Sequence, residues 1–173
     1  MLPHSRLGDG LVQRGVGALR LDLQLYDEIS ADAAGTGQAL RIVLLAGLSN
    51  GVSLVRRFGS AGIIAGVGAA LLGWVLWTAV IWLVAKALRC RPEGRSLLRA
   101  LGFANAPGVF LIFGALPIFG PFVRVIVVIW LVATTVRAAQ AVFALTMWRA
   151  LIISIVGFVV YLILGAASAQ FAS

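Results

Sequence analysis

The chain has 173 residues, of which 61% are hydrophobic and 12% charged, and its formal net charge is +8. A water-soluble domain is about 45–50% apolar and about 25% charged, and a fold of this size could not bury so much apolar surface. The composition therefore excludes an ordinary soluble domain and indicates an integral membrane protein. The basic residues lie at the edges of apolar runs, which excludes nucleic acid as a partner and favours contact with anionic lipid headgroups.

Residues 1–37 form the polar part of the chain and are expected to be a cytoplasmic segment. Leu11, Val16, Leu23 and Tyr26 recur at helical spacing within residues 8–29, and charged side chains fill the other side. This pattern predicts one amphipathic helix that lies in the membrane interface with its apolar face toward lipid. The stretch has no continuous apolar run of the kind that a secretory signal needs.

Residues 38–173 predict an all-α bundle of about five transmembrane helices, since about 20 apolar residues cross a hydrocarbon core of about 30 Å. The expected spans are 38–55, 60–88, 100–119, 122–143 and 150–169. The first is the weakest because Arg41 and Asn50 lower its hydropathy. The third is interrupted by Pro107 and Pro117, which cannot donate a backbone hydrogen bond.

The positions of the basic residues predict the topology. With five spans and a cytoplasmic N-terminus, eleven of the fourteen basic residues fall on the cytoplasmic side and three, Arg56, Arg57 and Arg124, on the other. This split obeys the positive-inside rule. If segment 38–55 lay on the membrane surface, the basic stretch 89–99 would move outside and the bias would disappear.

We therefore expect a multi-pass membrane protein with a cytoplasmic N-terminus. Its cytoplasmic loop should place four arginines at the lipid headgroups, namely Arg89, Arg91, Arg95 and Arg99.

Small residues mark the second span. Gly62, Gly66 and Ala70 lie on one side of the helix, and Gly73 belongs to a second small face beside it. Small side chains let helix backbones approach closely in lipid, where van der Waals contact drives association. The favoured interpretation is packing against another helix of the same chain, and the alternative is a homo-oligomer interface.

The apolar spans carry no acid and no histidine, which are the residues that usually mark proton transport, metal binding or catalysis in a membrane. The chain has one histidine and one cysteine, far apart in sequence, so no cofactor and no catalytic dyad is predicted. Asn105, just before Pro107, could satisfy a carbonyl that the proline frees, and Pro117 should end the third span. We expect these residues to mark a helix break.

Several stretches together resemble bacterial Yip-domain proteins, a family named after membrane proteins that interact with Ypt/Rab GTPases. The most specific are the run from Arg99 to Ala104 with Pro107, the turn from Pro117 to Gly120, Trp130, and the late run from Arg149 to Leu151. The resemblance covers about residues 15–168. It implies five spans, a cytoplasmic N-terminus, location in a bacterial inner membrane and, from the eukaryotic members, a role in membrane traffic and shaping. Those members have a longer N-terminal region, so a GTPase partner is not expected here.

The leading hypothesis is a non-enzymatic membrane scaffold, or an accessory subunit of a membrane complex, whose partners are lipids and other membrane proteins. The alternative is a small transporter or channel built on Asn105–Pro107, Pro117 and the Thr134–Thr135 pair. An embedded enzyme is the least favoured because the spans offer no acid, base or metal ligand.

Overall fold

The computed structural model describes residues 10–90 and 93–170, without the side chains of Arg57 and residues 160–170. Over that part of the chain all regular elements are helical and none is a strand, which confirms the all-α prediction. In chain order the elements are α1 (Leu11–Leu19), α2 (Leu23–Ala31), α3 (Gly35–Phe58), α4 (Ala61–Ala87), α5 (Gly94–Ala104), the 3-10 helix η1 (Ala106–Ala115), α6 (Gly120–Phe143) and α7 (Met147–Gln170).

Four helical segments are long and apolar enough to cross a membrane: Gly35–Arg56, Ala61–Ala87, Gly94–Ala115 and Gly120–Phe143. They overlap the first four expected spans. The largest difference is in the third, which begins at Gly94 and not at residue 100, because α5 already starts directly after Glu93. The described apolar part of α7, Met147–Val159, is shorter than a span, so the fifth span stays a prediction.

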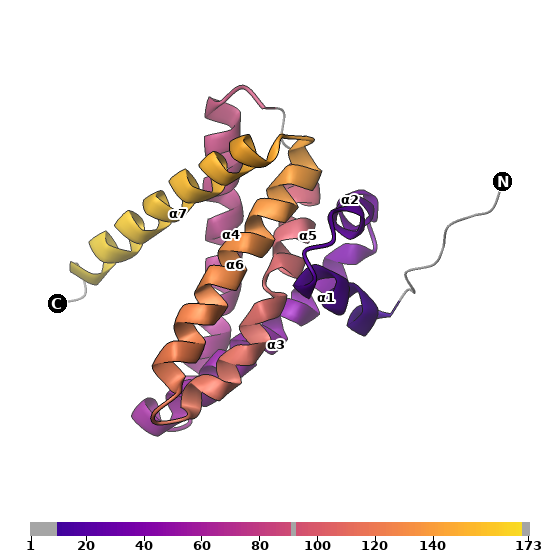
Figure 1. The fold of residues 1–173 in the computed structure, drawn as a ribbon. Coiled ribbons are helices and arrows are strands. Elements are labelled where there is room, and N and C mark those ends of the chain that lie inside the picture. Colours follow the sequence, from indigo (N-terminus) through magenta and orange to yellow (C-terminus); the bar gives the residue numbers. More distant parts are fainter. Residues whose placement is uncertain (1–9, 91–92, 171–173) are drawn as a thin grey trace.

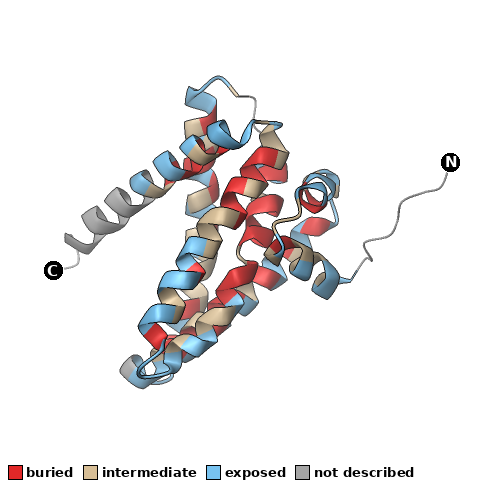
Figure 2. Ribbon diagram, viewed as in Figure 1, coloured by how far each residue is buried: buried red, intermediate tan, exposed pale blue. Residues whose placement is uncertain are grey.

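The four candidate spans run side by side, and α7 leaves the bundle at an angle (Figure 1). Helix α7 contacts α4 and α6, while α1 and α2 pack on the other side against α5, η1 and α6. Figure 2 shows that burial is concentrated on α5 and on the sides of its neighbours that face it. The two ends of the bundle differ. One end carries Arg89 and Arg95, and we call it the basic end; the other carries the turns at residues 59–60 and 116–119.

The single amphipathic helix expected over residues 8–29 is wrong in two respects. The helix is interrupted between α1 and α2, where Leu21 has a left-handed φ of 62°. Asp22 caps α2, because its side chain accepts a hydrogen bond from Gln24 N at 3.0 Å. The apolar face also packs on protein: Tyr26 and Ile29 are fully buried against the bundle. Burial against α5 and α6 replaces the contact with lipid that the pattern suggested.

Helix α3 approaches its neighbours closely through small residues. Gly62 and Gly66 of α4 lie against α3, so that a Cβ on Gly66 would overlap the backbone of Gly51 and lie 2.8 Å from Gly47 O. A Cβ on Gly51 would in turn lie 2.8 Å from Ile63 Cα. The face that Gly62 and Gly66 form is therefore occupied within the chain, and a homodimer through it would require α3 and α4 to separate.

We predict that Gly66→Ala destabilises the protein by about 1–3 kcal/mol, since the added methyl group forces the α3 and α4 backbones apart. Gly68→Ala is the matched control in the same helix, because a Cβ there meets nothing within 4 Å. Gly68→Ala should be neutral or stabilising by about 0.5–1 kcal/mol, because alanine lowers the backbone entropy of the unfolded chain. Thermal unfolding in mild detergent measures both, and equal melting temperatures for the two variants would contradict the packing argument.

Candidate functional site

A charged network at the start of α3 ties the N-terminal helices to the bundle. Arg14 of α1 forms an ion pair with Asp32 at 2.7 Å and donates to Gln38 Oε1 of α3 at 3.1 Å. Asp32 also accepts from Ala34 N at 2.9 Å, next to the beginning of α3. The hydrogen bond from Arg14 is the main reason that the pKa of the Asp32 carboxyl lies below its usual value.

Arg99 belongs to the same network, and its expected place at the lipid headgroups is wrong. The side chain is only 6% exposed, and its guanidinium donates to Ser30 O, at the C-terminal end of α2, and to Ser96 Oγ at 3.1 Å. Residues 94–99 are helical, so the arginine points inward from α5. A cation is favourable near unpaired carbonyls at a helix C-terminus. Arg99 therefore fixes α2 to α5.

The other expected headgroup arginines lie near the basic end. Arg89 follows α4 with a left-handed φ of 61°, and its side chain is exposed, as is that of Arg95 on the first turn of α5. Arg91 lies outside the described residues. These positions leave Arg89 and Arg95 open to headgroups.

The expected helix break lies between α5 and η1. Asn105 N donates to Gly102 O, so the carbonyl of Leu101 accepts from the Asn105 side chain, Nδ2, at 2.8 Å. Pro107 has no N–H, and the carbonyl of Ala104 accepts from Thr134 Oγ1 of α6 at 2.7 Å. Asn105 thus donates to the Leu101 carbonyl, which the change to a 3-10 helix frees. Thr134 donates to the Ala104 carbonyl, which lies nearer to the proline. Both groups would otherwise be unpaired in an apolar interior.

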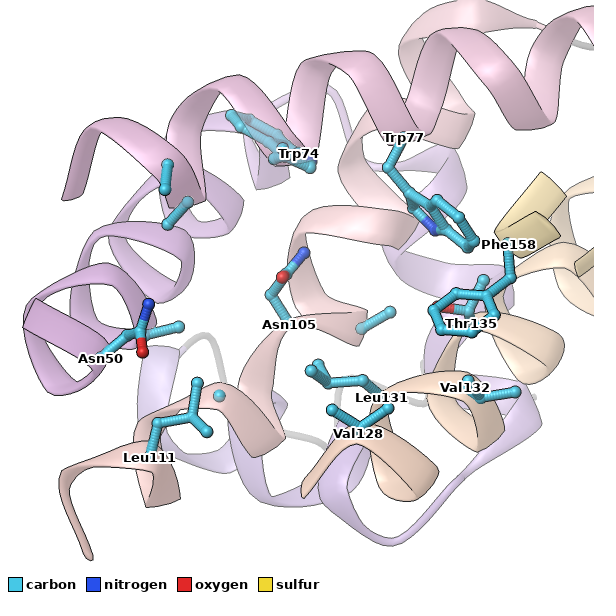
Figure 3. Close-up of a pocket in the computed structure, with 16 residues that line it drawn as sticks. Asn50, Trp74, Trp77, Asn105, Leu111, Val128, Leu131, Val132, Thr135 and Phe158 are labelled. Atoms are coloured by element: carbon cyan, nitrogen blue, oxygen red, sulfur yellow. The ribbon is translucent and has the colours of Figure 1, made fainter. Parts of the chain in front are cut away.

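A cavity of about 330 Å³ opens beside this break, between α4 and α6. Trp74, Asn105 and Leu131 lie at the middle of their candidate spans and line it, which puts the cavity at mid-height in the bundle. In Figure 3 Asn105 points into its centre, with Trp74 and Trp77 of α4 across from the aliphatic side chains of α6. The full lining is Ala46, Asn50, Ala69, Ala70, Gly73, Trp74, Trp77, Ala104, Asn105, Gly108, Leu111, Val128, Leu131, Val132, Thr135 and Phe158.

The cavity wall is neutral. Its polar side chains are Asn50, Asn105 and Thr135, and none of the lining residues is an acid, a base or a cysteine. Over the residues that the structure describes, no group of three or more His, Cys, Asp or Glu side chains could hold a metal ion. The site can therefore offer hydrogen bonds and apolar contact to a bound molecule.

The cavity draws together residues that the sequence treated separately. Ala70 and Gly73 of the predicted small faces line it with Asn105, whereas Pro107 is buried behind it and Pro117 lies exposed in the turn before α6. Sequence reasoning missed the pairing of Arg14 with Asp32, because no spacing rule links residues on different helices. For Arg99 a signal existed, since the apolar residues around it follow the period of a helix.

The ion pair predicts how stability depends on pH. The pKa of Asp32 is lower in the folded protein than in the unfolded chain, where it is about 3.9. The ionised carboxylate therefore adds its full contribution to folding stability above about pH 3.9, and this contribution is lost as pH falls through the folded pKa. The melting temperature of the native protein should exceed that of Asp32→Asn at neutral pH, by an amount equivalent to about 0.2–1 kcal/mol, and should converge with it in acid. Asp27→Asn, on the exposed side of α2, is the control. A difference that persists in strong acid would contradict the assignment.

Comparison with known proteins identifies the family. The model of the Yip1 domain matches residues 26–168, which include every helix from α3 to α6. No match was found among curated proteins or among solved structures. Proteins of this family are in general non-enzymatic and act in membrane trafficking. The match confirms the resemblance seen in the sequence, and the chain belongs to the Yip1-domain family of multi-span membrane proteins.

Proposed function

We propose that this chain is a non-enzymatic scaffold of a bacterial inner membrane, acting as an accessory subunit of a membrane complex. Its N-terminus is cytoplasmic, and α7 is the fifth span, consistent with a helix of 24 residues and with the bias of basic residues to one side. Lipid headgroups contact Arg89 and Arg95 at the basic end, and a protein partner contacts the N-terminal helices.

The observation that carries this proposal is the fixed attachment of α1 and α2 to the bundle. Arg99 and the Arg14–Asp32 pair anchor one side, and Trp130 of α6 donates its indole N–H to Leu19 O at 3.1 Å on the other. Trp130 is itself held by stacking on Phe110, with ring centroids 5.5 Å apart. A pair of short helices fixed in this way presents a pre-organised surface, which lowers the entropy cost of binding.

The exposed side of α2 suggests what kind of partner binds. Asp27 and Glu28 point outward there, beside the exposed Gln24, in a chain whose net charge is +8. Anionic lipid repels carboxylates, so this acidic face is better suited to a basic protein surface than to a membrane. Scaffolding through a protein–protein contact follows from this arrangement more directly than a purely lipid-bound role.

The second candidate function is a small transporter or channel, and the central cavity is the observation that favours it. Asn105 and Thr135 line the cavity, as such a role would need, but Pro117 and Thr134 do not. The lining comes from within the four candidate spans and from Phe158 of α7, and does not include the residues at either end of the bundle. This supports a binding cavity more directly than a path from one membrane face to the other.

The scaffold proposal is tested by purifying the tagged protein in gentle detergent and quantifying bound proteins and lipids by mass spectrometry. The double variant Asp27→Asn/Glu28→Gln should lower recovery of a stoichiometric partner by on the order of tenfold, because the complementary charges are lost. Gln13→Lys/Ala87→Lys changes net charge equally at exposed positions of α1 and α4, outside this acidic face, and should have little effect. The same loss in both variants, or no co-purifying protein, would contradict the docking face.

A flux assay separates the two candidates. Under the scaffold proposal, vesicles that contain the purified protein show no more solute or ion flux than empty vesicles. Flux that Ala69→Leu blocks by filling the cavity would instead favour the transporter.

A further inference from the structure

Beyond the scaffold role, the geometry points to a binding site for an isoprenoid quinone in the central cavity: the ring lies between the α4 tryptophans and α6, hydrogen-bonded to Thr135 and Asn105, and the chain leaves between α4 and α6.

Unpartnered polar groups inside the cavity indicate a ligand. Thr135 is 6% exposed, and no described residue accepts from or donates to its hydroxyl. Asn105 uses one N–H on Leu101 O, which leaves its Oδ1 and second N–H without a partner among the described residues. Thr134, the neighbour of Thr135, in contrast has three backbone carbonyls within hydrogen-bond distance of its single hydroxyl donor. Asn105 is half-buried and both residues line the cavity, so these polar groups can form hydrogen bonds to a molecule bound there.

The depth and charge of the site restrict that molecule. Asn105 lies at the middle of its span, about 15 Å from either headgroup layer if the hydrocarbon core is about 30 Å thick. The lining has no charge that could neutralise a phosphate or a carboxylate. A phospholipid would keep its headgroup and ester groups at the interface. The occupant therefore carries its polar group within the hydrocarbon layer and is uncharged, as a quinone is.

The shape of the wall and the place of the opening complete the argument. Trp74 and Trp77 face Val128 and Leu131 across the cavity, which gives a flat ring an aromatic side and an aliphatic side (Figure 3). Ala69 of α4 and Val128 of α6 line the cavity and are also exposed, so the cavity opens to the apolar outer surface of the bundle between these helices. A ligand would thus enter from lipid. A volume of about 330 Å³ fits a substituted ring, with the chain outside.

The test titrates decylubiquinone into the purified full-length protein in detergent and follows quenching of tryptophan fluorescence, since Trp74 and Trp77 line the site. The native protein should show saturable quenching. Thr135→Val keeps the shape, removes one hydrogen bond and should raise Kd by about two- to tenfold. Ala69→Leu fills the cavity and should abolish saturation. Ala79→Leu, at an exposed position of the same helix, should bind like the native protein.

Two results would overturn the proposal. Equal quenching in the native protein and in Ala69→Leu, with unchanged melting temperatures, would mean that the quinone only partitions into the micelle. A parallel titration with a phospholipid brominated on its acyl chain tests whether a lipid acyl chain, and not a quinone, occupies the cavity. The cavity would be assigned to an acyl chain under two conditions together. The brominated lipid quenches the native protein but not Ala69→Leu, and decylubiquinone gives no saturable quenching.

Discussion

Close contact through small residues around α3 is the constraint on which the rest of the structure depends. Glycines of α4 meet α3 on one side, and on others Gly102 of α5 and Gly108 of η1 would each place a Cβ under 3 Å from Ala39 or Ala46 of α3. Lipid offers no hydrophobic incentive for helices to associate, so this contact supplies van der Waals attraction that larger side chains would prevent. It explains how the least hydrophobic span can pack closely against α4, α5 and η1.

The break between α5 and η1 lies where α3 packs against both elements. Helix α3 packs against both halves of the broken span. The backbone carbonyls that the break frees at the end of α5 accept hydrogen bonds from Asn105 and from Thr134 of α6. The cavity lies beside the 3-10 helix η1, with lining residues from α4 and from α6. The neutral hydrogen-bonding groups of the cavity thus come from the residues at the break and from the adjacent turn of α6.

Charged and neutral side chains occupy different parts of the molecule. Ionisable groups gather in the network of Arg14, Asp32 and Arg99 around the start of α3, where they hold the N-terminal helices. The centre carries neutral groups and aromatic rings. Because charge is costly inside lipid, this division separates attachment of partners from binding of an apolar molecule. The proposed scaffold surface and the proposed quinone site can accordingly be altered one at a time.

The sequence by itself determined the membrane character, the helical class, the four candidate spans to within a few residues at most ends, and the family, because hydropathy and small-residue spacing are local properties. Only the tertiary structure decided where the amphipathic segment packs, that Arg99 is buried, and that Asn105 and Thr135 share a cavity with Trp74. Each of these depends on which helices meet. Periodicity along one helix reports that a face is apolar, but not whether lipid or another helix covers it.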